Sequence, residues 1–181
     1  MTVLANLDLS VFWDPSEFAT SEYVDELLTD ELLARVEAEL GYRLPAAYVA
    51  LCQNQNGGAP IRTCHRAATT SWAPDHVAIT NIKAIGFKNI WSLCGELGRD
   101  NTLTEWGYPA IGVYFADCPS AGHDMLCLDY RQLDDSGEPA VVHVSQGSDY
   151  TITFVAPSFE SFLLGLEPDE AFDDDGLSHS D

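Results

Sequence analysis

The C-terminal third of the chain, residues 122–166, most constrains the fold. Three short apolar segments at about 124–129, 140–144 and 150–155 have the composition of β-strands. Turn-forming residues separate them, and the gaps are too short for helical crossovers, so an antiparallel meander is predicted. Apolar side chains with helical spacing follow at Phe159, Phe162, Leu163 and Leu166. They predict a helix that closes over one face of the sheet.

The first third of the chain has the start and stop signals of helices. Thr29 is a suitable N-cap before two acidic residues, and Gly41 follows the last apolar residue of that helix. A second helix is predicted to begin at Pro45, a residue that suits the first helical position, and to stop at the turn 56–58. A shorter helix is expected at about 21–28.

The middle of the chain, residues 59–107, is the least regular part. Short strands are predicted at 77–79 and 84–86, and a short helix at 90–97. The following segment, 108–116, has apolar residues at alternate positions, which predicts a further strand.

Together these segments predict one α+β domain. We expect an antiparallel sheet of about four to six strands with helices packed mainly on one face. Residues 1–28 are expected to form an N-terminal extension that packs on the domain, and residues 29–166 the domain itself. Residues 167–181 carry seven acidic and no basic residues, which predicts a solvated, disordered tail.

The charge of the chain limits its partners. There are 29 acidic and 8 basic residues, a formal net charge of −21. Such a charge repels nucleic acid and anionic membrane surfaces, and it attracts a basic protein. Solubility alone is the alternative interpretation. No apolar run reaches the about 18 residues of a membrane span, and the start lacks the basic region of a secretory signal, so we expect a cytoplasmic protein.

Cysteine and histidine residues do not form a familiar chemical motif. Cys118, His123 and Cys127 have a C-x4-H-x3-C spacing, but the paired knuckle of structural zinc sites is missing. Cys64 and His65 are sequence neighbours, which do not face each other in a strand as a nucleophile and its base must. We therefore predict no catalytic residue, no cofactor and no metal ligand.

Three blocks of sequence carry a further pattern. The first combines LGYRLPAAY at 40–48 with NGG at 56–58. The second runs from Ile82 to the tryptophan at 91, and the third is the C-terminal stretch from Tyr108 to 166. In this order and spacing the blocks resemble the SUKH superfamily, also called the Smi/Knr family, over about residues 29–166.

The resemblance implies an α+β domain with a protein-binding role. Many bacterial members resemble immunity proteins that bind and neutralise a toxin, often a nuclease or deaminase, whereas fungal relatives take part in cell-wall regulation. We interpret the chain as a non-catalytic immunity protein that binds a basic toxin domain. A regulatory or scaffolding adaptor of the same fold is the alternative, and a hydrolase of unknown type is the third possibility.

Five residues are predicted to contact the partner: Trp72, Glu105, Trp106, Asp117 and Asp124. Carboxylates can occupy the basic cleft in which a nuclease toxin binds phosphate, and buried aromatic side chains add binding energy. The alternative is that the two tryptophans belong to the core and that the carboxylates are solvated loop residues or a catalytic pair.

Overall fold

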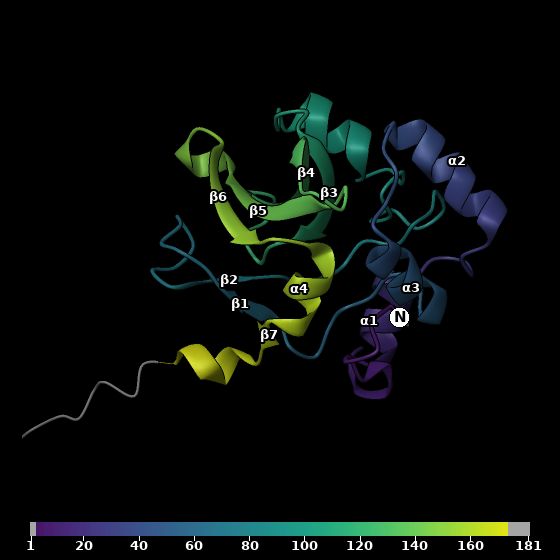
Figure 1. Ribbon diagram of the computed structural model, residues 1–181, viewed down its shortest axis with the longest axis horizontal. Coiled ribbons are helices and arrows are strands. Elements are labelled where there is room, and N and C mark those ends of the chain that lie inside the picture. Colours follow the sequence, from purple (N-terminus) through teal and green to yellow (C-terminus); the bar gives the residue numbers. More distant parts are fainter. Residues whose placement is uncertain (1–2, 174–181) are drawn as a thin grey trace, which may run out of the picture.

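The computed structural model describes residues 3–173 and contains two antiparallel sheets (Figure 1). The larger sheet has four strands in chain order, β3 (Gly112–Asp117), β4 (Asp124–Leu133), β5 (Pro139–Ser145) and β6 (Thr151–Ala156). Each strand pairs antiparallel with the next. The predicted meander and the predicted α+β class are therefore confirmed.

The smaller sheet has the order β2-β1-β7, with β1 (Cys64–Arg66) between β2 (His76–Ala78) and β7 (Leu166–Glu167). The sequence predicts a strand near β2 but not β1 or β7, and it predicts one sheet instead of two. Strands of two or three residues are too short to show alternation. In addition, β7 pairs with a strand that is distant in the sequence.

The segment that follows β7 packs on the smaller sheet. A short 3-10 helix, η4 (Asp169–Phe172), places the ring of Phe172 on His76, with ring centroids 4.3 Å apart. The Arg66 guanidinium lies 4.9 Å from the centroid of the Phe172 ring. The described part of the expected tail is thus in contact with the domain, because one aromatic residue interrupts its acidic composition. Residues 174–181 lie outside the described residues.

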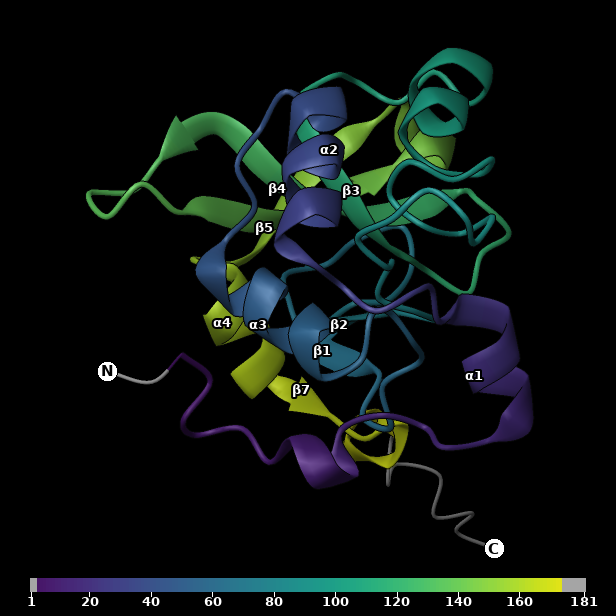
Figure 2. The same cartoon turned by 90° about the vertical axis from the view of Figure 1, so that its right-hand side faces the viewer.

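Three of the α-helices lie on the same side of the molecule. Figure 2 shows this side, with α1, α2 and α3 facing the viewer. The α-helices are α1 (Glu17–Tyr23), α2 (Asp30–Leu40), α3 (Ala46–Asn54) and α4 (Phe159–Leu164). Three further turns of helix are η1 (Leu9–Val11), the π-helix η2 (Asn101–Glu105) and η3 (Gln146–Ser148). Among residues 3–173, no helix is long and apolar enough to cross a membrane.

The termini of α2 follow the sequence signals. The Thr29 side chain accepts a hydrogen bond from the Leu32 N–H at 3.1 Å, and Gly41 ends the helix at φ +78°. Helix α1 begins earlier than predicted, because Ser16 caps it by accepting the Ala19 N–H.

Two predictions for the middle of the chain are wrong. Residues 84–86 and 90–97 form turns, not a strand and a helix. The Asn56 side chain takes the place of a neighbouring strand, since its amide donates to the Ile85 carbonyl at 3.0 Å and accepts the Ile85 N–H at 2.8 Å. The backbone N–H and carbonyl of Ile85 are therefore satisfied by one side chain, an arrangement that hydrophobic periodicity does not reveal.

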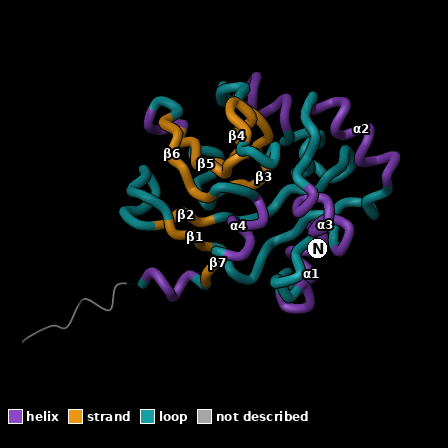
Figure 3. The backbone as a smooth tube through the Cα atoms, viewed as in Figure 1, coloured by secondary structure: helices purple, strands orange, loops and turns teal. Residues whose placement is uncertain are grey.

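Apolar side chains pack on both faces of the larger sheet. On one face, α4 lies between the two sheets (Figure 3), and Phe159 and Phe162 pack edge-on against Phe115 of β3. Tyr48 of α3 stacks on Phe159 at 4.7 Å. On the other face, a second apolar cluster packs beneath the segment that contains η2. It comprises Tyr108, Ile111, Tyr114, Met125, Cys127, Val142 and Val144.

Candidate functional site

A cleft of about 330 Å³ lies where the end of α1, the turns after residue 88, the end of η2 and the β3–β4 loop meet. Three aromatic side chains, Tyr23, Trp91 and Trp106, line it together with Asn81 and Asp117. We call it the aromatic cleft. Two of the residues predicted to contact a partner, Trp106 and Asp117, are therefore brought together here.

One wall of the aromatic cleft joins α1 to the turn that carries Trp91. The Trp91 indole N–H donates to the Glu22 carboxylate at 2.8 Å, and the Asn89 side chain donates to the Glu22 carbonyl at 2.8 Å. The rings of Tyr23 and Trp91 lie with centroids 6.3 Å apart at 60°. These bonds fix the indole in place before any partner arrives.

Another part of the lining is Trp106, which directly follows η2. Its carbonyl accepts hydrogen bonds from the Gln146 side chain at 3.0 Å and the Tyr150 hydroxyl at 2.5 Å. The indole packs on the backbone of Gly122, where φ is +88°. A Cβ at that position would approach the indole to 3.0 Å. Glycine is thus required here both by its backbone conformation and by the close approach of the ring.

One of the lining residues, Asp117, belongs to an ion pair with Lys83, which does not itself line the cleft. Lys83 Nζ lies 2.9 Å from Asp117 Oδ2, and the Asn81 amide donates to the same oxygen at 2.9 Å. The Lys83 side chain is 1 % exposed, and its ammonium also donates to the Trp91 carbonyl at 3.3 Å. Among the described residues, none donates to Asp117 Oδ1. Since the Asp117 side chain is 13 % exposed, this second oxygen is available to a ligand.

Asp124 lies outside the aromatic cleft, in the interior. Its Oδ1 accepts the Ser71 hydroxyl at 2.9 Å and lies 3.0 Å from Nε2 of His143. Ser71 and Ser145 also share a hydrogen bond at 2.6 Å. Burial lowers the pKa of His143, and the Asp124 carboxylate opposes this effect. The network attaches the β1–β2 loop to the ends of β4 and β5, so Asp124 offers a partner little surface.

The remaining two predicted contact residues are exposed but do not line the cleft. Glu105 is the last residue of η2, beside Trp106. Trp72 is 37 % exposed in the β1–β2 loop, where its N–H donates to the Thr70 hydroxyl at 3.1 Å. Sequence reasoning missed Tyr23, Trp91 and Lys83 as members of the site. The usable signal is Lys83, a charged residue within an apolar run.

The cysteine and histidine side chains considered above do not form a reactive group. Burial raises the pKa of the Cys118 thiol at the cleft well above its usual value, which favours the unreactive protonated form. His65 turns away from Cys64: its Nδ1 lies 2.7 Å from the Arg66 carbonyl, and its ring stacks on Phe162. Within residues 3–173, no three His, Cys, Asp or Glu side chains gather to hold a metal ion.

Comparison with known proteins identifies the family. The model of the SMI1 / KNR4 family (SUKH-1) matches residues 27–165, most of the chain, and the chain belongs to this family. A search of curated proteins returns no match. Membership supports an immunity or cell-wall regulatory role and protein–protein interaction at the level of the family. Trp91, Trp106 and Asp117 lie within the matched range, whereas Tyr23 precedes it.

Proposed function

We propose that this chain is a non-catalytic immunity protein that binds and neutralises a partner toxin through the aromatic cleft. The observation that carries the proposal is the grouping of Tyr23, Trp91 and Trp106 around the Asp117 carboxylate. Partly exposed aromatic side chains beside one polar anchor are typical of the few residues that supply most of the energy of a protein interface.

The construction of the cleft supports this proposal. The carbonyl of Trp106 and the indole of Trp91 both take part in hydrogen bonds with other elements, so the walls lose little conformational freedom when a partner binds. The buried Lys83 holds Asp117 from behind. A site prepared in this way suits recognition of one partner of defined shape.

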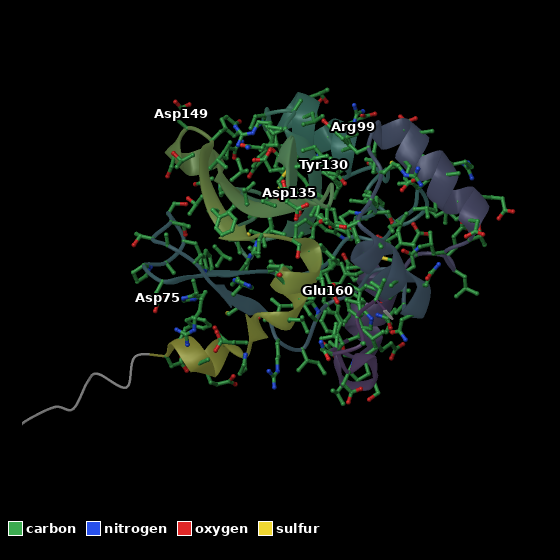
Figure 4. All side chains as sticks on the ribbon, viewed as in Figure 1. Asp75, Arg99, Tyr130, Asp135, Asp149 and Glu160 are labelled. Carbon is green, nitrogen blue, oxygen red and sulfur yellow. The ribbon has the colours of Figure 1, made fainter. Side chains whose placement is uncertain are left out.

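The distribution of charge indicates a basic partner. Five of the eight lysine and arginine side chains are already paired with carboxylates, those of Arg66, Lys83, Lys88, Arg99 and Arg131. Figure 4 shows acidic side chains on separate loops and on α4, at Asp75, Asp135, Asp149 and Glu160. A net charge of −21 accelerates the approach of a basic toxin domain and disfavours an acidic one.

A pull-down from the native host's lysate tests the proposal. The tagged full chain is compared at low and high salt with Trp106→Ala, Trp91→Ala and the control Phe154→Ala. Phe154 is 59 % exposed on β6 and is not part of the cleft. We expect one stoichiometric basic protein that is retained by the control, lost by both cleft variants and weakened by salt. Its toxicity, and rescue by co-expression of this chain, complete the test.

Absence of rescue, or capture that both cleft variants leave unchanged, would contradict the proposal. Trp72→Ala is a separate arm of the same experiment. If Trp72→Ala loses the partner, the interface includes the β1–β2 loop as well as the cleft. If it retains the partner, Trp72 does not contribute to the interface.

A regulatory or scaffolding adaptor is the second candidate function. A shallow hollow of about 530 Å³ on the larger sheet contains two exposed apolar side chains, Leu133 and Phe154, beside Asp134 and Glu138. An exposed apolar surface of this kind is a feature of interaction sites. The same pull-down separates the two functions, since an adaptor would capture several proteins weakly and lose a subset of them in Phe154→Ala.

A further inference from the structure

We infer that the aromatic cleft binds the side chain of an arginine that the partner presents. The inference rests on the proposed function, because it specifies the chemistry of the partner at the same cleft. It combines three features of the described residues: a carboxylate oxygen without a donor, aromatic side chains in the same lining, and a negative surrounding field.

The carboxylate oxygen selects a hydrogen-bond donor. Asp117 Oδ2 receives both Lys83 and Asn81, whereas Oδ1 receives no donor from the described residues. An aliphatic or phenyl side chain that filled the cleft would remove Oδ1 from water without replacing its hydrogen bonds, and this is unfavourable. The occupant therefore supplies N–H or O–H groups at its tip.

The aromatic walls select a flat cation. A guanidinium is planar, weakly hydrated and able to stack on an aromatic face while its edge donates to a carboxylate. Trp91 and Trp106 both line the cleft, and Tyr23 adds a third ring beside Trp91. A lysine ammonium is a compact and strongly hydrated charge that gains less from this geometry.

The positive charge of Lys83 is paired within the chain. Lys83 is not among the residues that line the cleft, its ammonium is engaged by Asp117 Oδ2 and the Trp91 carbonyl, and it lies 5.7 Å from the centroid of the Trp91 ring. Two carboxylates, Glu22 and Asp117, lie near the Tyr23 hydroxyl at the cleft, and after burial they are the next causes that raise the pKa of Tyr23. The full chain, at −21, reinforces this field.

Nuclear magnetic resonance of the full ¹⁵N-labelled chain tests the inference with three small probes. They are the N-acetyl methylamides of arginine, lysine and citrulline, which is nearly isosteric with arginine but neutral. The chain has four tryptophans, so Trp13 and Trp72 serve as internal controls for Trp91 and Trp106. The four indole N–H signals are assigned with Trp→Phe variants.

We expect arginine to shift the Trp91 and Trp106 signals in a saturable way at millimolar concentration, with the two control signals unchanged. Citrulline and lysine should need several-fold higher concentrations. Equal responses to arginine and citrulline would overturn the inference, as would an absence of any shift with arginine. The titrations themselves use the unaltered protein, and the Trp→Phe variants serve only to assign the signals.

A double variant then tests whether Asp117 supplies the negative charge that recognises arginine. Lys83→Met combined with Asp117→Asn removes both members of the ion pair and leaves no buried charge alone. We expect this variant to prefer arginine over citrulline less strongly than the unaltered chain does, because the aromatic side chains and the net charge remain, and an unchanged preference would contradict the assignment to Asp117.

The two proposals fail in different ways. One outcome is that the chain captures a toxin through the cleft but shows no shift with arginine. This outcome would refute this inference alone. Arginine binding without any captured toxin would refute the immunity function and leave the site in place.

Discussion

Lys83 and Asp117 form an ion pair beneath the aromatic cleft, with Nζ 2.9 Å from Oδ2 and side-chain exposures of 1 % and 13 %. The two residues come from the irregular segment after β2 and from the end of β3, so the pair links segments that are distant in the sequence. Each charge is stabilised by the other in a site with little water. Removal of one charge is therefore expected to lower the free energy of unfolding more than removal of both.

Lys83→Met should therefore destabilise the chain by about 3–5 kcal/mol, since it leaves Asp117 partly buried without its cation. The combined variant Lys83→Met with Asp117→Asn should recover much of that loss. Urea unfolding of the three proteins measures both quantities. A double variant as unstable as the single one would show that Lys83 acts through its packing and not through its charge.

Phe162→Ala should destabilise the chain by about 3–5 kcal/mol, the usual cost of a large buried aromatic. Phe162 is fully buried, with its ring 5.5 Å from Phe115 and 5.3 Å from His65. Phe154→Ala is the matched control, because Phe154 is 59 % exposed, and it should change stability by less than about 1 kcal/mol. Equal effects in chemical denaturation would contradict the packing of α4 on the larger sheet.

Gly122→Ala should disturb the Trp106 wall. The new methyl group meets the indole at 3.0 Å, and the φ of +88° is unfavourable for alanine. Gly137→Ala is the control for backbone strain alone, because φ is +83° there and no atom lies within 4 Å of the added group. We expect only Gly122→Ala to weaken partner capture and to shift the Trp106 indole signal. Similar behaviour of both variants would mean that the ring contact is unimportant.

Stability should fall as the pH decreases through about 6.5, the unperturbed pKa of histidine. Burial lowers the pKa of His143 and of His65 in the folded chain. The unfolded chain therefore binds protons at a higher pH than the folded chain, and mild acid favours unfolding. Urea unfolding at about pH 7.5 and about pH 5.5 measures the change.

His143→Gln should reduce this pH dependence, because one of the two groups no longer titrates. The carboxylates whose pKa is lowered, including Asp129 and Asp134, lose their contribution only at more acidic pH and do not interfere in this window. An identical pH slope for the variant and the unaltered chain would exclude His143 as a contributor.

The sequence alone predicted the elements whose signals are local. The meander of β4, β5 and β6 follows from short apolar runs separated by turns, and the limits of α2 follow from Thr29 and Gly41. These features depend on residues close together in the chain, where propensity, capping and turn geometry operate directly. The family resemblance was likewise carried by the order of such local blocks.

The tertiary structure decided the features that depend on distant contacts. The sequence predicted Trp106, Asp117 and Asp124 as contact residues, but only the fold groups the first two with Tyr23 and Trp91 in one cleft and buries Asp124 away from it. It also places Asn56 against the backbone of Ile85 and pairs β7 with β1. Burial and hydrogen-bond partners are set by three-dimensional packing between remote segments, and periodicity along one segment does not encode which remote segment will meet it.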